Sequence, residues 1–102
     1  MQSEGAGVTI GVVTIRMRLP SRTLKEKRTI VKSVVERLRQ RYNAAVIEAE
    51  HLDNAQLGTI AAVVLSNDSR HADEQAQAIV TSVTEWRLDA EVYDVQVEMI
   101  DV

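Results

Sequence analysis

The chain has no cysteine, no phenylalanine and a single proline among its 102 residues. Without cysteine it can hold no disulfide framework, no CxxC metal or redox motif and no thiol nucleophile. Aromatic residues make up only 3% of the sequence, which argues against a surface of stacked rings that reads single-stranded RNA. GxSxG motifs and glycine-rich phosphate loops are also missing. We therefore expect a noncatalytic protein without a cofactor or a metal ion.

Long apolar runs are missing too. The longest, Ile60 to Leu65, is far too short to span a bilayer. The opening residues, "MQSEGAG", lack the basic and hydrophobic regions of a signal peptide. We expect a soluble cytoplasmic protein with no membrane partner, in which residues 1–7 form a flexible tail and residues 8–102 form a single domain.

The remaining sequence alternates between two kinds of periodicity. Segments rich in β-branched residues or alternating in polarity predict strands at residues 8–19, 44–52, 60–65 and 90–102. Apolar residues at helical spacing predict a first helix at residues 23–42. A second helix is predicted after the cap residues "SNDS" (66–69), with His71 in its first turn and Arg87 in its last. The order β-α-β-β-α-β is typical of the ferredoxin-like α+β class, with one four-stranded antiparallel sheet and two helices packed on one face.

Several local patterns make sharper predictions. Thr23 and Glu26 have the spacing of a capping box at the start of the first helix. The continuously apolar residues 60–65 predict a central strand buried on both faces. In the last strand, alternation places Tyr93 on the same face as the valines that follow it. In the second strand it places Glu48 and Glu50 on one face, where they are solvated or paired with Arg16 or Arg18.

Charge is distributed very unevenly. Between Arg16 and Arg41 there are ten lysine and arginine residues against two glutamates, a net +8, whereas the rest of the chain carries two cations and thirteen acids, a net −11. The cation excess includes the start of the first helix, where the helix dipole favours carboxylates. A local rule broken without visible compensation suggests a functional site.

The basic residues of the first helix form our candidate anion site. With 100° per residue, Lys25, Arg28, Lys32 and Arg39 fall within a sector of about 60° beside the apolar stripe, and we name these four the cationic track. Lys27 is expected on the other flank of the stripe, with its ammonium reaching water. The predicted RNA- or anion-binding residues are Arg22, Lys25, Lys27, Arg28, Lys32 and Arg39. An extended row of charge fits an RNA backbone better than a small nucleotide.

Three alternatives carry less weight. Glu48, Glu50, His51 and Asp53 are close in sequence, but alternation directs His51 away from the glutamates, so they do not converge on a metal ion. A small-ligand domain of the ACT type would need a glycine where "PSR" follows the first strand. A protein-interaction module could form a homodimer through edge strands or through the +8 and −11 regions.

The runs "LKEKR…VKS…RLR…N" and "SND" resemble the bacterial YlxP-like family. The resemblance implies a ferredoxin-like fold, a bacterial cytoplasmic location and no established activity. Genes of this family commonly neighbour those for translation initiation factor two and ribosome-binding factor A, which implies a link to ribosomal RNA. Ala55 stands where the family often has an aromatic residue. Our leading hypothesis is an RNA- or ribosome-associated accessory factor that uses the first helix; the alternative is an interaction module that binds no nucleic acid.

Overall fold

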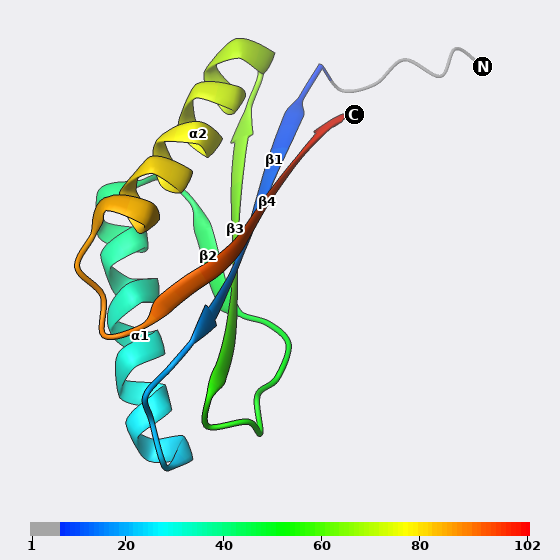
Figure 1. Cartoon of the computed structure of the whole chain (residues 1–102). Coiled ribbons are helices and arrows are strands. Elements are labelled where there is room, and N and C mark those ends of the chain that lie inside the picture. Colours follow the sequence, from blue (N-terminus) through cyan, green and yellow to red (C-terminus); the bar gives the residue numbers. More distant parts are fainter. Residues whose placement is uncertain (1–6) are drawn as a thin grey trace.

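The computed structural model describes residues 7–102; residues 1–6 of the predicted tail lie outside the described residues. The six elements follow the predicted order (Figure 1). They are β1 (Thr9–Arg18), α1 (Leu24–Arg41), β2 (Ala45–Glu48), β3 (Leu57–Ser66), α2 (Ser69–Glu85) and β4 (Glu91–Asp101).

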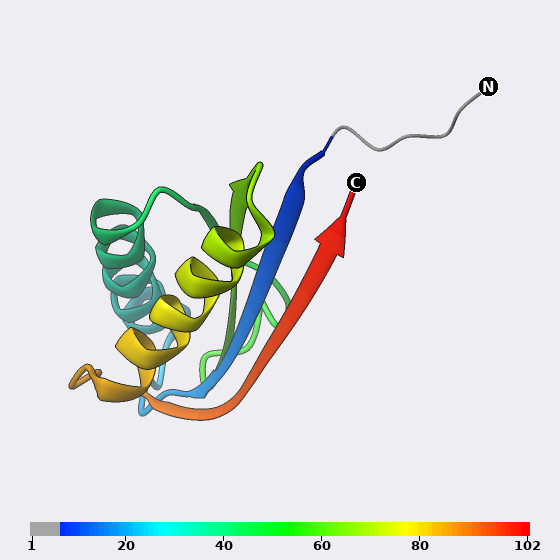
Figure 2. The same cartoon turned by 90° about the horizontal axis from the view of Figure 1, so that it is seen from above.

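The four strands form one antiparallel sheet in the order β2-β3-β1-β4. Both helices cover the same face of this sheet, as the view in Figure 2 makes plain. The predicted ferredoxin-like α+β fold is therefore confirmed. We call the sheet surface turned away from the helices the open face.

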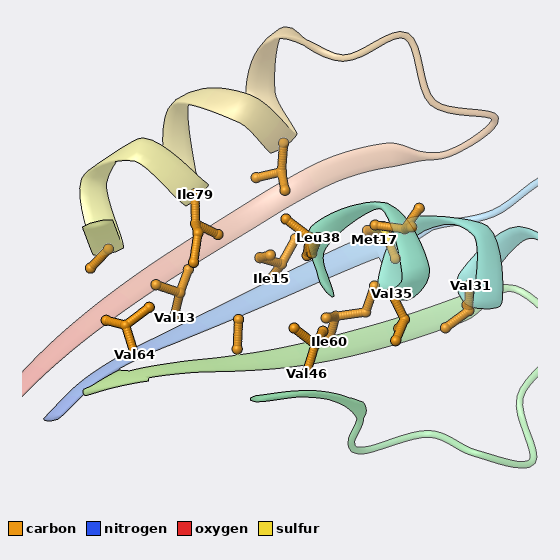
Figure 3. Close-up of a cluster of buried hydrophobic side chains, with 14 of the residues drawn as sticks. Val13, Ile15, Met17, Val31, Val35, Leu38, Val46, Ile60, Val64 and Ile79 are labelled. Carbon is orange, nitrogen blue, oxygen red and sulfur yellow. The ribbon is translucent and has the colours of Figure 1, made fainter. Parts of the chain in front are cut away.

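The core fills the space between the helices and the sheet (Figure 3). Val13, Ile15 and Met17 alternate along β1 and are fully buried, as the strand periodicity predicts. Leu38 of α1 and Ile79 of α2 pack onto them from above. Burying side chains of this size removes enough apolar surface from water to make this layer the main source of stability.

Both helices begin at side-chain caps. The Thr23 hydroxyl accepts a hydrogen bond from the Glu26 amide at 3.1 Å, as predicted, whereas the Glu26 carboxylate accepts from the Arg22 amide, one residue earlier than in a standard capping box. Asp68 caps α2 by accepting from the amides of Arg70 and His71. Asp68 belongs to the predicted cluster of cap residues, 66–69.

The strand β2 is shorter than the predicted strand at residues 44–52: it ends at Glu48. The chain then turns, and His51 adopts a left-handed backbone conformation with φ 63°. The turn reverses the alternation, so Glu48 lies toward α1 while Glu50 lies toward the open face, against Arg16. The prediction that Glu48 and Glu50 share a face is wrong.

A bulge in β4 breaks a second predicted alternation. The pairing with β1 shifts between Arg16 and Met17, so that Val92 rather than Tyr93 opposes the buried Met17. Tyr93 is 37% exposed, and its ring stacks on the guanidinium of Arg18, with 4.5 Å between Cζ and the ring centroid. The prediction that Tyr93 shares the inward face with the following valines is wrong, because one extra residue in the strand resets which side chains point inward.

Candidate nucleic-acid interface

Five of the six predicted site residues lie exposed on or just before α1: Arg22, Lys25, Arg28, Lys32 and Arg39. Among residues 7–102, no carboxylate lies within ion-pair distance of Arg22, Lys25 or Arg28. Lys32 approaches Glu36 at 3.9 Å, but 74% of its side chain is exposed. An exposed pair of this kind contributes little, so the charge of Lys32 also remains available to a ligand.

The cationic track borders a shallow groove between α1 and the edge strand β2. Arg28, Lys32 and Arg39 form one side of this groove, and its floor includes Val31 and Val35. The groove has a volume of about 340 Å³ and is open to solvent. The structure therefore places three of the four residues of the cationic track along one side of this groove.

Arg39 has a second contact that limits its freedom. Its Nη2 donates a hydrogen bond to the Val46 carbonyl at 2.5 Å. Because β2 is the outermost strand on this side of the sheet, this bond satisfies a backbone group on the open edge of β2. Arg39 is still exposed as a whole, so it can serve a ligand only partly.

Lys27 does not belong to this surface, and its predicted role is wrong. The residue is fully buried, and its ammonium donates to the His51 carbonyl at 2.5 Å. The same Nζ lies 3.0 Å from Glu48 Oε2, whose side chain is 21% exposed. Lys27 thus ties α1 to the end of β2 and cannot reach an external phosphate.

The burial of Lys27 has a signal in the sequence. On the helical wheel it falls about 20° from both Val34 and Leu38, in the middle of the apolar stripe rather than on its flank. A lysine at that position must find a buried partner, since an unpaired buried charge is very costly. Glu48, twenty-one residues later, supplies that partner.

Arg16 is a polar centre that the predicted site did not include. On the open face, its Nη2 donates to Glu50 Oε1 at 2.9 Å, and its Nη1 donates to Asp94 Oδ2 at 3.2 Å and to Gln96 Oε1 at 3.1 Å. The hydrogen bond to Glu50, followed by the attraction of both carboxylates, raises the pKa of Arg16 above its usual range. The predicted pairing of Glu50 with Arg16 is confirmed, and it joins β1, β4 and the β2–β3 connection.

The remaining cations of α1 rest on aromatic rings. The Arg37 guanidinium lies 4.1 Å from the centroid of the Trp86 ring, and Arg41 lies 5.9 Å from that of Tyr42. Tyr42 is the C-cap of α1, and its hydroxyl donates to the Ala78 carbonyl of α2 at 3.0 Å. These contacts fasten α1 to α2, on the flank of α1 that lies away from the groove.

Two other site types receive no support from the described part of the chain. Glu48 and Glu50 turn to different basic partners, and residues 7–102 contain no group of three side chains placed to hold a metal ion. Neither α1 nor α2 is both long and apolar enough to cross a membrane.

Comparison with solved structures supports the fold. The structure titled "De novo designed protein Foldit4" superposes with a TM-score of 0.56 at 13% identity, covering 91% of this chain and 96% of that one. "De novo designed protein Ferredog-Diesel" superposes with a TM-score of 0.52 at 15% identity, covering 96% and 89%. Identities this low carry information about the fold alone.

No curated protein matches the chain. A family model described as "Protein of unknown function (DUF503)" matches residues 10–97, a range that includes both helices and the whole cationic track. The chain therefore belongs to the DUF503 family.

Proposed function

We propose that this protein is a noncatalytic accessory factor that binds RNA through the exposed cations of α1. The proposed partner is the RNA of the bacterial ribosome. The observation that carries the proposal is a contrast between paired and unpaired cations. Lys27 and Arg16 form ion pairs with carboxylates of the chain itself. Arg22, Lys25 and Arg28 have no carboxylate partner among residues 7–102. The resemblance to the YlxP-like family favours the ribosome as the source of that RNA.

The dimensions of the cationic track favour a long polyanion. Lys25 and Arg39 are fourteen residues apart, or about 21 Å along the helix axis. Lys25, Lys32 and Arg39 recur every seven residues and so project from nearly the same side of the helix. Such a row can meet successive phosphates of one strand. Because no aromatic side chain lines the groove beside it, we expect recognition by charge and backbone shape rather than by base identity.

The test begins with cosedimentation of the purified chain with ribosomes, and with its binding to a fluorescent RNA, over a range of salt concentrations. If about four phosphates are neutralised, affinity for a single strand falls on the order of 50-fold between about 50 and 200 mM salt. Ribonuclease treatment releases the protein from the ribosomal fraction if RNA is the partner, and leaves it bound if the partner is a protein.

A pair of charge-matched variants locates the contact. Arg28→Glu with Lys32→Glu removes half of the cationic track, and we expect it to abolish ribosome retention while the fold survives. Arg70→Glu with Arg87→Glu makes a comparable charge change at two exposed positions outside α1, and we expect it to weaken binding only slightly. An equal loss of ribosome binding in both variants would mean that net charge, and not the position of the cations on α1, determines binding. Ribosome retention that changes neither with salt concentration nor in the α1 variant would exclude the proposal.

A further inference from the structure

Glu48 is an acid in a groove that is otherwise basic and apolar. The groove between α1 and β2 is lined by three cations of the cationic track, by apolar side chains and by Glu48. No other carboxylate of residues 7–102 lines it. A carboxylate repels phosphate, so in a site that binds phosphate alone it would oppose binding. The presence of Glu48 therefore indicates that a second chemical group of the ligand lies here.

The pairing of Glu48 with Lys27 leaves the carboxylate able to accept hydrogen bonds. Glu48 Oε2 lies 3.0 Å from Lys27 Nζ, while the ammonium donates its hydrogen bond to the His51 carbonyl. Oε2 is buried, and no donor of residues 7–102 reaches it with hydrogen-bond geometry. A buried acceptor normally has such a donor. Because an ionised carboxylate has about four acceptor positions, Glu48 can accept from a ligand and keep its ion pair with Lys27.

Two contacts between α1 and β2 fix the place of Glu48 along the groove. Arg39 donates to the Val46 carbonyl. Glu48 follows Val46 by two residues, so it lies about 7 Å further along β2 on the same face of the strand. Lys27, the neighbour of Arg28 in α1, then pairs with Glu48. The carboxylate therefore lies alongside the cationic track rather than beyond it.

We propose that Glu48 accepts a hydrogen bond from a ribose 2′-hydroxyl of the bound strand and thereby makes the groove select RNA over DNA. This role rests on the proposed function, because the cationic track must hold the phosphates on either side of that ribose. A ribose presents a hydroxyl donor and an apolar ring surface between two phosphates. The groove offers the matching groups: a carboxylate, a floor that includes Val31 and Val35 (Figure 3), and a row of cations.

DNA would leave the same carboxylate without a donor. A deoxyribose in the groove would displace water from Glu48 and return no hydrogen bond, while the phosphates would still repel the carboxylate. Because a hydrogen bond to a charged group is among the stronger ones in proteins, we expect its loss to weaken binding by about 10-fold or more. This selection reads the sugar of the backbone, so it does not depend on base identity.

The experiment measures binding of the full chain to three fluorescent single strands of one sequence: RNA, DNA, and RNA whose 2′-hydroxyls are replaced by fluorine. The fluorinated strand keeps an RNA-like sugar but has no 2′ donor, so it separates the loss of the hydroxyl from a change in strand shape. We expect RNA to bind about 10-fold or more tightly than either of the other strands.

Variants of Glu48 test whether this residue is the source of the selection. Lys27→Met with Glu48→Met removes the carboxylate without leaving the ammonium unpaired, and the net charge of the chain stays the same. We expect this variant to bind RNA and the fluorinated strand equally. Glu48→Gln leaves a neutral, weaker acceptor and should reduce the preference for RNA. Glu50→Gln is the matched control, since it removes one carboxylate on the open face, where Glu50 pairs with Arg16, and it should keep the full preference.

Circular dichroism verifies that each variant is folded, and the comparison of strands on the wild type needs no variant. Equal binding of RNA and the fluorinated strand by the wild type, with binding still lost in Arg28→Glu with Lys32→Glu, overturns the role of Glu48 and leaves RNA binding by α1 in place. A preference for RNA that persists in Lys27→Met with Glu48→Met, or that is lost equally in Glu50→Gln, also overturns this role. A wild-type chain that binds none of the three strands overturns both proposals.

Discussion

The seam between α1 and β2 and the outer surface of α1 use the same residue types in opposite ways. In the seam, the Lys27 side chain is 1% exposed and its ammonium meets Glu48 and the His51 carbonyl. On the outer surface, the Lys32 side chain is 74% exposed and meets only Glu36, at 3.9 Å. Five positions along one helix thus separate a lysine that belongs to the fold from one that is available to a ligand.

Cation counts alone therefore do not define a binding surface. A charge moved out of water must be compensated by a partner, and the compensated charge then has nothing left to offer an external anion. An exposed cation gains little from its neighbours in the chain, so it can be kept for a ligand at almost no cost to folding. The following predictions test this division, beginning with the change that should disturb folding most.

Lys27→Ala should have the largest effect on stability. It removes the buried ammonium and leaves the Glu48 carboxylate without its partner, which we expect to lower the free energy of unfolding by about 3 kcal/mol. Lys32→Ala, on the same helix, should change it by less than about 0.5 kcal/mol. Urea denaturation followed by circular dichroism measures both values.

A double variant separates lost charge pairing from lost packing. Lys27→Met with Glu48→Met replaces the ion pair by apolar side chains of similar length, and it should recover most of the stability that Lys27→Ala loses. If Lys27→Ala lowered the free energy of unfolding no more than Lys32→Ala does, the buried lysine would contribute no more to stability than the exposed one. The distinction between the two regions would then be wrong.

Arg16→Gln should have a smaller effect, centred on the β2–β3 connection. It removes the bonds to Glu50 and Asp94 that tie this connection to β1 and β4. We expect faster amide exchange at residues 49–56 with little change in the helices, and partial recovery in Arg16→Lys. Hydrogen exchange followed by mass spectrometry resolves these segments. Protection of residues 49–56 equal to that of the wild type would contradict the role assigned to Arg16.

The pH dependence of this effect has a defined sign. The folded state raises the pKa of Arg16, chiefly through its hydrogen bond to Glu50, so the charged form is favoured by folding. Stability from such a group is fully present below its unfolded pKa and is lost only as the pH rises through the higher folded value. The difference between wild type and Arg16→Gln should therefore stay constant as the pH is raised from about 7 to about 10.

Periodicity made most of the fold predictable. Alternation along residues 8–19 and the helical stripe around Val31, Val34 and Leu38 placed β1 and α1 to within one or two residues. Periodicity did not predict where β2 ends or where β4 contains a bulge. Glu48, the last residue of β2, pairs with Lys27 of α1, and the bulge in β4 lies in its pairing with β1, so both features involve contacts between distant parts of the chain.

The candidate site was predictable to the extent that it depends on one helix. The exposure of Lys25, Arg28 and Lys32 follows from their angular position on α1 alone. The position of Lys27 indicated burial, but its partner could be identified only from the packing of β2 against α1. Leu65 is the converse case. The continuously apolar residues 60–65 predict a strand buried on both faces, but the helices cover only one face of β3 (Figure 2), and Leu65 on the other face is 63% exposed.

The smallest expected effect on stability comes from Lys25→Glu. Lys25 lies in the first turn of α1, where the helix dipole disfavours a cation, so a carboxylate there should raise the free energy of unfolding by about 0.5 kcal/mol. The same change should weaken RNA binding, because it places an acid within the cationic track. Lys32→Glu carries the same change of charge but lies beyond the reach of the dipole, one turn from Glu36, and should give no such gain. Urea denaturation and RNA titration of both variants test whether the start of α1 trades stability for binding; a Lys25→Glu variant that gains no stability, or that binds RNA as tightly as the wild type, would show that it does not.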